Sequence, residues 1–332
     1  MFHFNLKRFS TSRTQIMGVS MILVVLFHSG FDLSAVPLLA LLKQWGDIGV
    51  DMFLLMSGIG IYHSLYKKPD TAAYIRNRFH RILPAHLIVC GCWFFFLDIV
   101  LYREGILTFL MDVSSLNFWF NGQLTTWYLS SLLVMQVLTP MYIKIWEKYP
   151  RFDCFIIPAV FIVCGVITYT PALDSILNHL LVFVYRIPAY LVGLSIGKKI
   201  CEQRSEISVS VPVVICVLGL SSLILAISSG LTPFYLRWVL RYVAYLPLAL
   251  MLCAVAALIP NNGILHFCGT RSLEIYLLHE KLLWVLTVLS SRLIGQDNNS
   301  SFLINLLAVL LSCFGAEILH KLIARFIQRK ES

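Results

Sequence analysis

Residues 210–230 read SVPVVICVLGLSSLILAISSG, a run in which no side chain carries a charge. A transmembrane helix needs about 20 consecutive apolar residues to cross a hydrocarbon layer about 30 Å thick. Runs of similar length and character recur along the whole chain of 332 residues. This stretch therefore predicts an integral membrane protein built from helices.

The overall composition agrees with this prediction. The chain is 58% hydrophobic and 13% charged, with a mean hydropathy of +0.80, whereas soluble domains contain about 25% charged residues. We expect an all-α protein with about ten transmembrane helices in a single domain, 1–332, without an appended soluble domain. The expected spans are roughly 15–33, 44–65, 82–101, 125–146, 153–171, 175–197, 208–229, 233–258, 272–294 and 301–324.

The distribution of positive charge predicts the orientation. With both termini in the cytoplasm, most of the 26 lysines and arginines fall in cytoplasmic segments, as the positive-inside rule requires. Topology and anionic lipid account for the net charge of +9, so we expect the lipid bilayer and no nucleic acid as a partner. Cys90 and Cys92 face different ways on a helix and form no ligand pair, and we expect no metal.

The first span ends in ILVVLFHSGFD, residues 22–32, which places an imidazole at the end of an apolar run. His28 could be a neutral ring that is hydrogen-bonded to a neighbouring helix. Its near-neutral pKa also suits a general base that takes a proton from an attacking hydroxyl. Asp32 lies four residues further on, one helical turn away, and could orient the ring or simply begin the outer loop.

The second span, WGDIGVDMFLLMSGIGIYHSLYKK (45–68), carries two carboxylates and several small residues. Asp47 and Asp51 are four residues apart, which places both carboxylates on one helical face. Ser57, Gly58 and Gly60 would let another helix, or a slender ligand, approach the backbone closely. Packing and ligand binding explain these small residues equally well.

Two further polar clusters lie near the predicted membrane boundaries. YIRNRFHRILPAH (74–86) contains Arg76, Arg78 and Arg81, which satisfy either the positive-inside rule or a phosphate site that uses the planar guanidinium fork. CGTRSLEIYLLHEKLLW (268–284) adds a second intramembrane histidine, His279. The other polar residues of that stretch are Glu274, Tyr276, Glu280 and Lys281.

Taken in order, these motifs resemble the acyltransferase type 3 family of integral membrane acyltransferases. The resemblance rests on VVLFH in span one, GVDMFLLMSG in span two, RNRFHRILP before span three and SLEIYLLH in span nine. TTWYLSSLLVMQVLTP (125–140) and RIPAYLVGLSIGK (186–198) are weaker echoes. Each motif is weak alone, but the ordered set is specific and covers residues 16 to about 280.

The resemblance implies a ten-helix core that transfers an acyl group, usually acetyl, from cytoplasmic acyl-CoA to a hydroxyl. The expected donor is acetyl-CoA, and the expected acceptor is a cell-surface carbohydrate, such as a polysaccharide, or a glycolipid. The expected location is the plasma membrane of a bacterial cell. We assign His28 and Asp32 to catalysis, and the donor site to Arg76, Arg78, Arg81 and Ser57. Expected to bind substrate or support the site are Asp47, Asp51, Trp127, Tyr128, Glu274, Tyr276 and His279.

One position departs from the family pattern, and one other function fits the composition. Members often carry an arginine eleven residues before the histidine of span one, where this chain has Met17. Arg13 or another cationic loop could take over that role. The alternative function is a secondary transporter with an intramembrane polar site, although we found no inverted repeat. The arginines and His28 should lie roughly 15–20 Å apart along the membrane normal.

Overall fold

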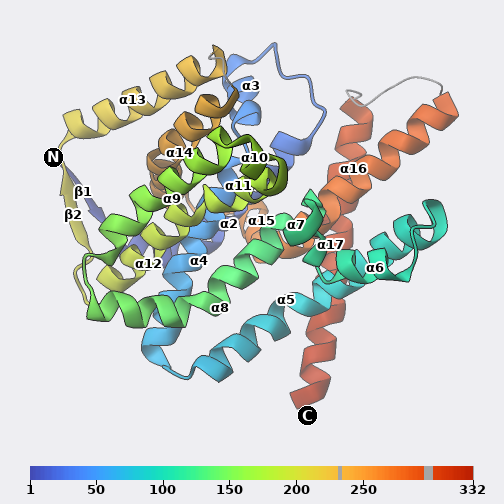
Figure 1. The fold of residues 1–332 in the computed structure, drawn as a ribbon, viewed down its shortest axis with the longest axis horizontal. Helices are drawn as coiled ribbons and strands as arrows, with labels where there is room; N and C mark the ends of the chain where they lie inside the picture. Colours follow the sequence, from blue (N-terminus) through green and yellow to red (C-terminus); the bar gives the residue numbers. More distant parts are fainter. Residues whose placement is uncertain (231–233, 295–301, 332) are drawn as a thin grey trace. The chain divides into compact units, whose positions relative to one another are not determined.

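The chain is built almost entirely of helices in the computed structural model, which describes residues 1–230, 234–294 and 302–331 (Figure 1). A helix lies at each of the predicted apolar runs, because a backbone surrounded by lipid must pair its own N–H and C=O groups. Residues 233 and 301, where two predicted spans begin, lie outside the described residues.

The elements follow one another along the chain with short connections. Up to residue 126 they are β1 (Phe2–Asn5), α1 (Lys7–Thr11), α2 (Arg13–His28), α3 (Pro37–Gln44), α4 (Ile48–Lys67), α5 (Thr71–Phe94), the π-helix η1 (Phe95–Leu101), α6 (Ile106–Val113), α7 (Leu116–Asn121) and η2 (Leu124–Thr126). The later elements are α8 (Trp127–Lys148), α9 (Phe152–Tyr169), α10 (Pro171–Leu177), η3 (Asn178–Leu180), α11 (Leu181–Val184), α12 (Ile187–Cys201), β2 (Glu206–Val209), α13 (Val211–Gly230), α14 (Phe234–Ala256), α15 (Gly263–Thr270), α16 (Ser272–Ile294) and α17 (Phe302–Glu331).

Several of these helices are long and apolar enough to cross a membrane. Within the described residues, five segments meet both criteria, Ile48–Lys67, Thr71–Leu101, Leu124–Lys148, Pro171–Cys201 and Phe302–Arg325. Shorter apolar helices cover Arg13–His28, Phe155–Tyr169, Val211–Leu225 and Val243–Ala256. The predicted helical membrane protein is thereby confirmed, while the count of ten spans and the orientation stay predictions.

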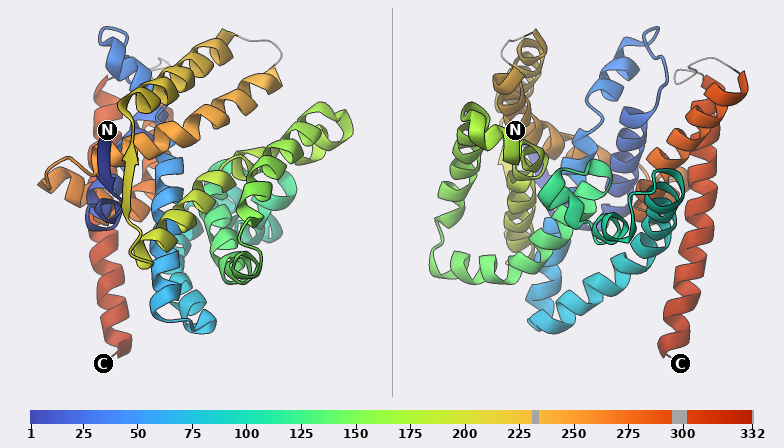
Figure 2. Two further views of the ribbon diagram at one scale, coloured as in Figure 1. Left: turned by 90° about the vertical axis from the view of Figure 1, so that its left-hand side faces the viewer. Right: turned by 45° about the vertical axis from the view of Figure 1, so that its right-hand side comes forward.

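Two features differ from the predicted all-α pattern. β1 and β2 pair antiparallel, with Phe2 opposite Val209 and Asn5 opposite Glu206 (Figure 2). The predicted span 175–197 lies within a series of shorter helices, α10 to α12, instead of one continuous helix. Pro171 and Pro188 occupy the first turns of α10 and α12, where a missing backbone N–H sacrifices no hydrogen bond and a new helix starts readily.

The helices form two compact units, and each unit combines stretches that are distant in sequence. The first unit contains Met1–Arg13, Asp51–Ile75 and Ser115–Ile259, and the second contains Thr14–Val50, Arg76–Ser114 and Pro260–Ser332. The expectation of a single domain is not tested by this division and stays a prediction.

Close helix contacts through glycine organise each unit. In the first unit, a Cβ on Gly58 would lie 2.4 Å from the carbonyl oxygen of Tyr190, so α4 and α12 touch through their backbones. Packing therefore explains Gly58. In the second unit, a Cβ on Gly49 would lie 2.4 Å from the carbonyl oxygen of Ser20. This contact holds the start of α4 against α2, and α16 and α17 lie side by side in the same unit (Figure 1).

Candidate active site

His28 is the last residue of α2 and lies in the second unit. The helix stops there because Ser29 turns its hydroxyl back to the carbonyl of Leu26, at 2.7 Å, and the Gly30 N–H donates to Asn305 Oδ1 at 2.6 Å. Nδ1 of His28 lies 2.9 Å from the carbonyl oxygen of Val24. The ring is therefore anchored to the final turn of its own helix.

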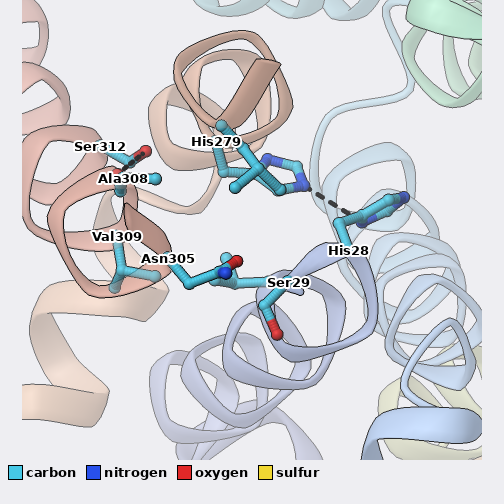
Figure 3. Close-up of a pocket in the computed structure, with 9 residues that line it drawn as sticks. His28, Ser29, His279, Asn305, Ala308, Val309 and Ser312 are labelled. Atoms are coloured by element: carbon cyan, nitrogen blue, oxygen red, sulfur yellow. Dashed lines mark hydrogen bonds between the residues drawn. The ribbon is translucent and has the colours of Figure 1, made fainter. Parts of the chain in front are cut away.

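α16 presents two side chains to this ring. Glu280 places Oε1 2.7 Å from Nε2 of His28. His279 places Nε2 3.2 Å from Nδ1 of His28 (Figure 3). His279 is buried, whereas the side chains of His28 and Glu280 are 30% and 39% exposed. The His28–Glu280 pair is thus partly exposed, and the buried His279 contacts the other nitrogen of the His28 ring.

The surrounding carbonyl groups determine where the imidazole protons lie. Nδ1 of His279 faces the carbonyl oxygens of Ile275 and Tyr276 at 3.1 and 2.8 Å. A carbonyl oxygen can only accept, so we assign a proton to this Nδ1, and Nε2 of His279 becomes an acceptor. Nδ1 of His28 then carries a proton that is directed at Val24 and His279. Nε2 of His28 faces Glu280 at 2.7 Å, and because a carboxylate oxygen only accepts, a proton lies between these two atoms.

The same three side chains could also be considered as metal ligands. His28, His279 and Glu280 each offer one ligand atom, and these atoms lie within 4.8 Å of one another. Two histidines and a carboxylate are residue types that bind zinc. The 2.7 Å contact between His28 and Glu280 has the length of a charge-assisted hydrogen bond. A cation would have to displace the proton between them, so the geometry fits a histidine–carboxylate pair better.

Asp32 lies in the segment after α2, whereas the predicted span 15–33 placed it within the helix. Because α2 ends at His28, Asp32 does not share the helical face of His28, and of the two alternatives that the sequence left open it follows the second, in the segment after the helix. Its Oδ1 accepts the backbone N–H of Ser34 at 3.0 Å, and this hydrogen bond lowers the pKa of the exposed carboxyl. Asp47, which is buried, lies close enough to act electrostatically on His28. Among the described carboxylates, Glu280 is the one paired with His28.

Two hollows adjoin the end of α2. A small one of about 10 Å³ is lined by His28, His279 and Asn305 among others (Figure 3), and it has room for about one water. A larger one of about 520 Å³ lies over the segment after α2, within the range of small-molecule sites. Its lining residues include Phe27, Phe31, Asp32, Ser34, Lys43 and Gln44.

The predicted donor-site arginines lie on α5, in the second unit. Arg76 and Arg81 are exposed, and Arg78 is partly exposed. Arg81 lies within electrostatic range of Arg78 and of Glu274 on α16. Glu274 and Glu280 are separated by six residues of α16, which is about 9 Å along the helix axis. α16 thus carries Glu274, which lies near Arg81, and also His279 and Glu280, which contact His28.

The remaining predicted residues of α16 also lie near these groups. Glu274 is buried, and its Oε1 lies 2.9 Å from Nδ1 of His320 on α17. The Tyr276 ring lies 5.9 Å from the ring of His279. Glu274 is therefore close to Arg81, and Tyr276 is close to His279.

The first unit holds a separate group of predicted residues. Asp51 accepts a 2.5 Å hydrogen bond from Arg186, and both side chains are buried. The guanidinium of Arg186 lies 5.3 Å from the ring centre of Trp127, and Tyr128 packs on Phe53 with ring centres 6.2 Å apart. Ser57 is buried in α4. The Asp51 carboxylate is thus engaged in an internal ion pair.

Arg13 also belongs to the first unit, where its Nη1 donates to the carbonyl oxygen of Met56 at 2.7 Å. The same guanidinium lies against Gly60, because a Cβ built there would be 2.5 Å from Nη1. Arg13 therefore contacts the GVDMFLLMSG segment. It is the arginine that the sequence analysis suggested as a replacement for the one that family members often carry at the position of Met17.

Two residues at the site were not predicted to act there. Glu280 was noted only as one polar residue of its span, and its neighbour His279 was taken as the supporting group. Asn305 lies in α17, outside the quoted motifs, and is 1% exposed while its Oδ1 holds the Gly30 backbone. The sequence signal for Glu280 was its position next to His279, an intramembrane histidine. Two neighbouring residues in one helical turn can contact the same partner, which here is His28.

The fold and the site together show a chain of apolar helices with a partly exposed histidine–carboxylate pair. Comparison with known families then places the chain. The model of the acyltransferase type 3 family, described as an acyltransferase domain, matches residues 16–320, so the chain belongs to this family. No curated protein and no solved structure matches the chain. The protein is therefore an acyltransferase, and the family match favours that activity over the transporter alternative.

Proposed function

We propose that the protein is a membrane O-acyltransferase that moves an acyl group, acetyl in the simplest case, from cytoplasmic acyl-CoA to a hydroxyl of a cell-surface carbohydrate or glycolipid. The observation that carries this proposal is the partly exposed His28–Glu280 pair in a chain of the acyltransferase family. The modified product would be a polysaccharide or a similar surface molecule of a bacterial cell, and the enzyme would act in its plasma membrane.

The proton transfer would run through His28. When the proton between Nε2 and Glu280 has been released to water and an acceptor hydroxyl lies beside Nε2, this nitrogen can remove the hydroxyl proton as the oxygen attacks the thioester carbon. The C–O bond forms, the C–S bond breaks, and the proton passes to the CoA sulfur. Glu280 remains close enough to stabilise the imidazolium, and the Val24 carbonyl and His279 hold its other nitrogen.

The donor would bind along α5 and α16. Arg78 and Arg81 offer guanidinium groups suited to the phosphates of CoA, with Arg76 as a further cation nearby. The thioester at the end of the pantetheine arm would then reach His28 along α16, over an axial rise of about 9 Å between Glu274 and Glu280. Binding both reactants at one place would contribute to the rate through proximity.

The acceptor would bind in the hollow of about 520 Å³ at the end of α2. Phe27 lies with its ring edge-on to His28, at 5.0 Å between ring centres, and Phe31 lines the same hollow. Asp32, Lys43 and Gln44 add groups that can hydrogen-bond sugar hydroxyls. This mixture of aromatic and polar side chains suits a carbohydrate.

The decisive experiment supplies purified protein in lipid nanodiscs with radiolabelled acetyl-CoA and surface material from the source cells. We expect an alkali-labile label in the acceptor and one free CoA thiol for each ester formed. His28→Ala should reduce the rate by about 10²–10⁴-fold, the usual loss for a general base. Full turnover in this variant, with insertion and folding preserved, would remove His28 from the mechanism.

A further inference from the structure

α3 is a short helix in the connection between α2 and α4 (Figure 1), and none of its eight residues is buried. Leu38, Leu39 and Leu41 are 66%, 41% and 39% exposed, and Val36, just before the helix, is 47% exposed. Apolar side chains that gather on one exposed surface mark a place where another apolar phase or molecule makes contact. This face of α3 therefore requires an apolar environment.

The other face of α3 is turned toward the end of α2. The residues of α3 that line the hollow of about 520 Å³ are Ala40, Lys43 and Gln44. Nζ of Lys43 donates to the carbonyl oxygen of Phe31 at 2.5 Å, which fixes this face inward. With about 3.6 residues per helical turn, Leu38 and Leu41 project from the opposite side. α3 is thus amphipathic, with its polar face on the hollow and its apolar face outward.

The position of α3 in the chain indicates what covers its apolar face. It joins two apolar helices, α2 and α4, and α4 is long enough to cross a membrane. The segment between them therefore lies at a membrane surface. With eight residues, α3 is about 12 Å long and cannot cross a hydrocarbon layer of about 30 Å. An amphipathic helix at this depth lies in the interface, with its apolar face among the lipid chains.

We propose that α3 lies in the lipid interface and forms the lipid-facing wall of the hollow, so that the acceptor is a saccharide carried on a lipid anchor. The acceptor class rests on the proposed function, whereas the position of α3 does not. The saccharide would enter the hollow beside Asp32 and Gln44, while its anchor stays in the same leaflet as Leu38 and Leu41. An anchored saccharide is confined to the layer where the hollow opens, which raises its effective concentration above that of a free saccharide.

Spin labels test the position of α3 without any measurement of activity. On a cysteine-free background in nanodiscs, a nitroxide at Leu38→Cys should collide more often with oxygen, which concentrates among lipid chains, than with a water-soluble nickel chelate. Gln44→Cys, on the polar face, should show the reverse. A label at position 38 that prefers the nickel chelate would place this face in water, and a label that neither reagent reaches would place it against protein. Either result would overturn the inference.

The acceptor class is tested with radiolabelled acetyl-CoA and surface material from the source cells, separated into lipid-extractable and lipid-free saccharides. At equal sugar concentration, the lipid-extractable saccharides should gain the ester label faster by about tenfold or more. Faster labelling of the lipid-free saccharides would overturn the acceptor class. Labelling of neither fraction would instead count against the proposed function.

Variants of α3 connect the two measurements. Leu38→Glu should slow labelling of the lipid-extractable saccharides by about tenfold or more, because each apolar carbon withdrawn from lipid costs about fourfold, and should leave the lipid-free rate unchanged. Ala35→Glu is the matched control, because Ala35 is exposed, precedes α3 and does not line the hollow. It should keep both wild-type rates, as should Leu38→Phe, which stays apolar. Equal rates for Leu38→Glu and Ala35→Glu, in proteins with the same thermal unfolding, would contradict the proposal.

Discussion

Replacing Glu280 by glutamine tests the histidine–carboxylate pair directly. Glutamine keeps the size of the side chain and removes its charge, so the 2.7 Å contact with Nε2 of His28 loses its ionic component. Hydrogen bonds to charged groups contribute about 1.5–3 kcal/mol. Since about 1.4 kcal/mol corresponds to a tenfold change in rate, complete loss of this contribution would slow the reaction by about 10–100-fold.

The exposure of the pair reduces this expectation. The two side chains are 30% and 39% exposed, so water screens the charge and takes over part of the interaction. We therefore expect Glu280→Gln to lower kcat by about tenfold, less than the loss for His28→Ala. The substituted glutamine should leave the KM for acetyl-CoA close to that of the wild type, because Glu280 contacts the base and not the arginine cluster.

The assay is the release of CoA thiol in nanodiscs at saturating acetyl-CoA, with each variant first checked for its thermal unfolding. Glu147→Gln is the matched control, because Glu147 is exposed at the end of α8 and should keep the wild-type rate. Glu280→Asp, which preserves the charge on a shorter side chain, should recover part of the activity. A wild-type rate for Glu280→Gln, together with an inactive His28→Ala, would show that His28 acts without help from the Glu280 carboxylate.

Three further results are expected. Arg78→Ala and Arg81→Ala should each raise the KM for acyl-CoA, and lysine at either position should restore only part of the affinity. If titrations with CoA are unchanged in both alanine variants, these arginines only set the membrane orientation through the positive-inside rule. Asp51→Asn should destabilise the protein by about 3–5 kcal/mol because it leaves Arg186 buried without its ionic partner, whereas Asp32→Asn at an exposed site should change the unfolding temperature little. On a cysteine-free background, Ser34→Cys should react with a membrane-impermeant thiol reagent in intact cells and Asp70→Cys should not, and the reverse pattern would invert the predicted orientation.

The sequence predicted the helices well because lipid leaves the backbone few alternatives. A long apolar run such as 210–230 must pair its own backbone groups, so its helix follows from composition. The β1–β2 pair did not follow, because four-residue strands alternate too briefly to stand out and their partners are about 200 positions apart. The division of residues 171–201 was readable in principle from Pro171 and Pro188, which start new helices.

The sequence predicted the individual residues of the candidate site but not the contacts between them, for a similar reason. His28 and His279 were each visible as ionisable side chains in apolar runs, but the contact between them joins residues 251 positions apart. Backbone contacts between helices, such as Gly18 of α2 against the carbonyl of Leu265 in α15, bring these positions together, and a sequence pattern does not name the partner of a glycine. Asp32 looked like the companion of His28 because a helix was assumed to continue past it. Once Ser29 and Gly30 end α2, that relationship is lost, and the carboxylate has to come from another helix. Glu280 fulfils this requirement because it lies next to His279, so a single turn of α16 delivers both the group that fixes the proton on Nδ1 and the charge that faces Nε2.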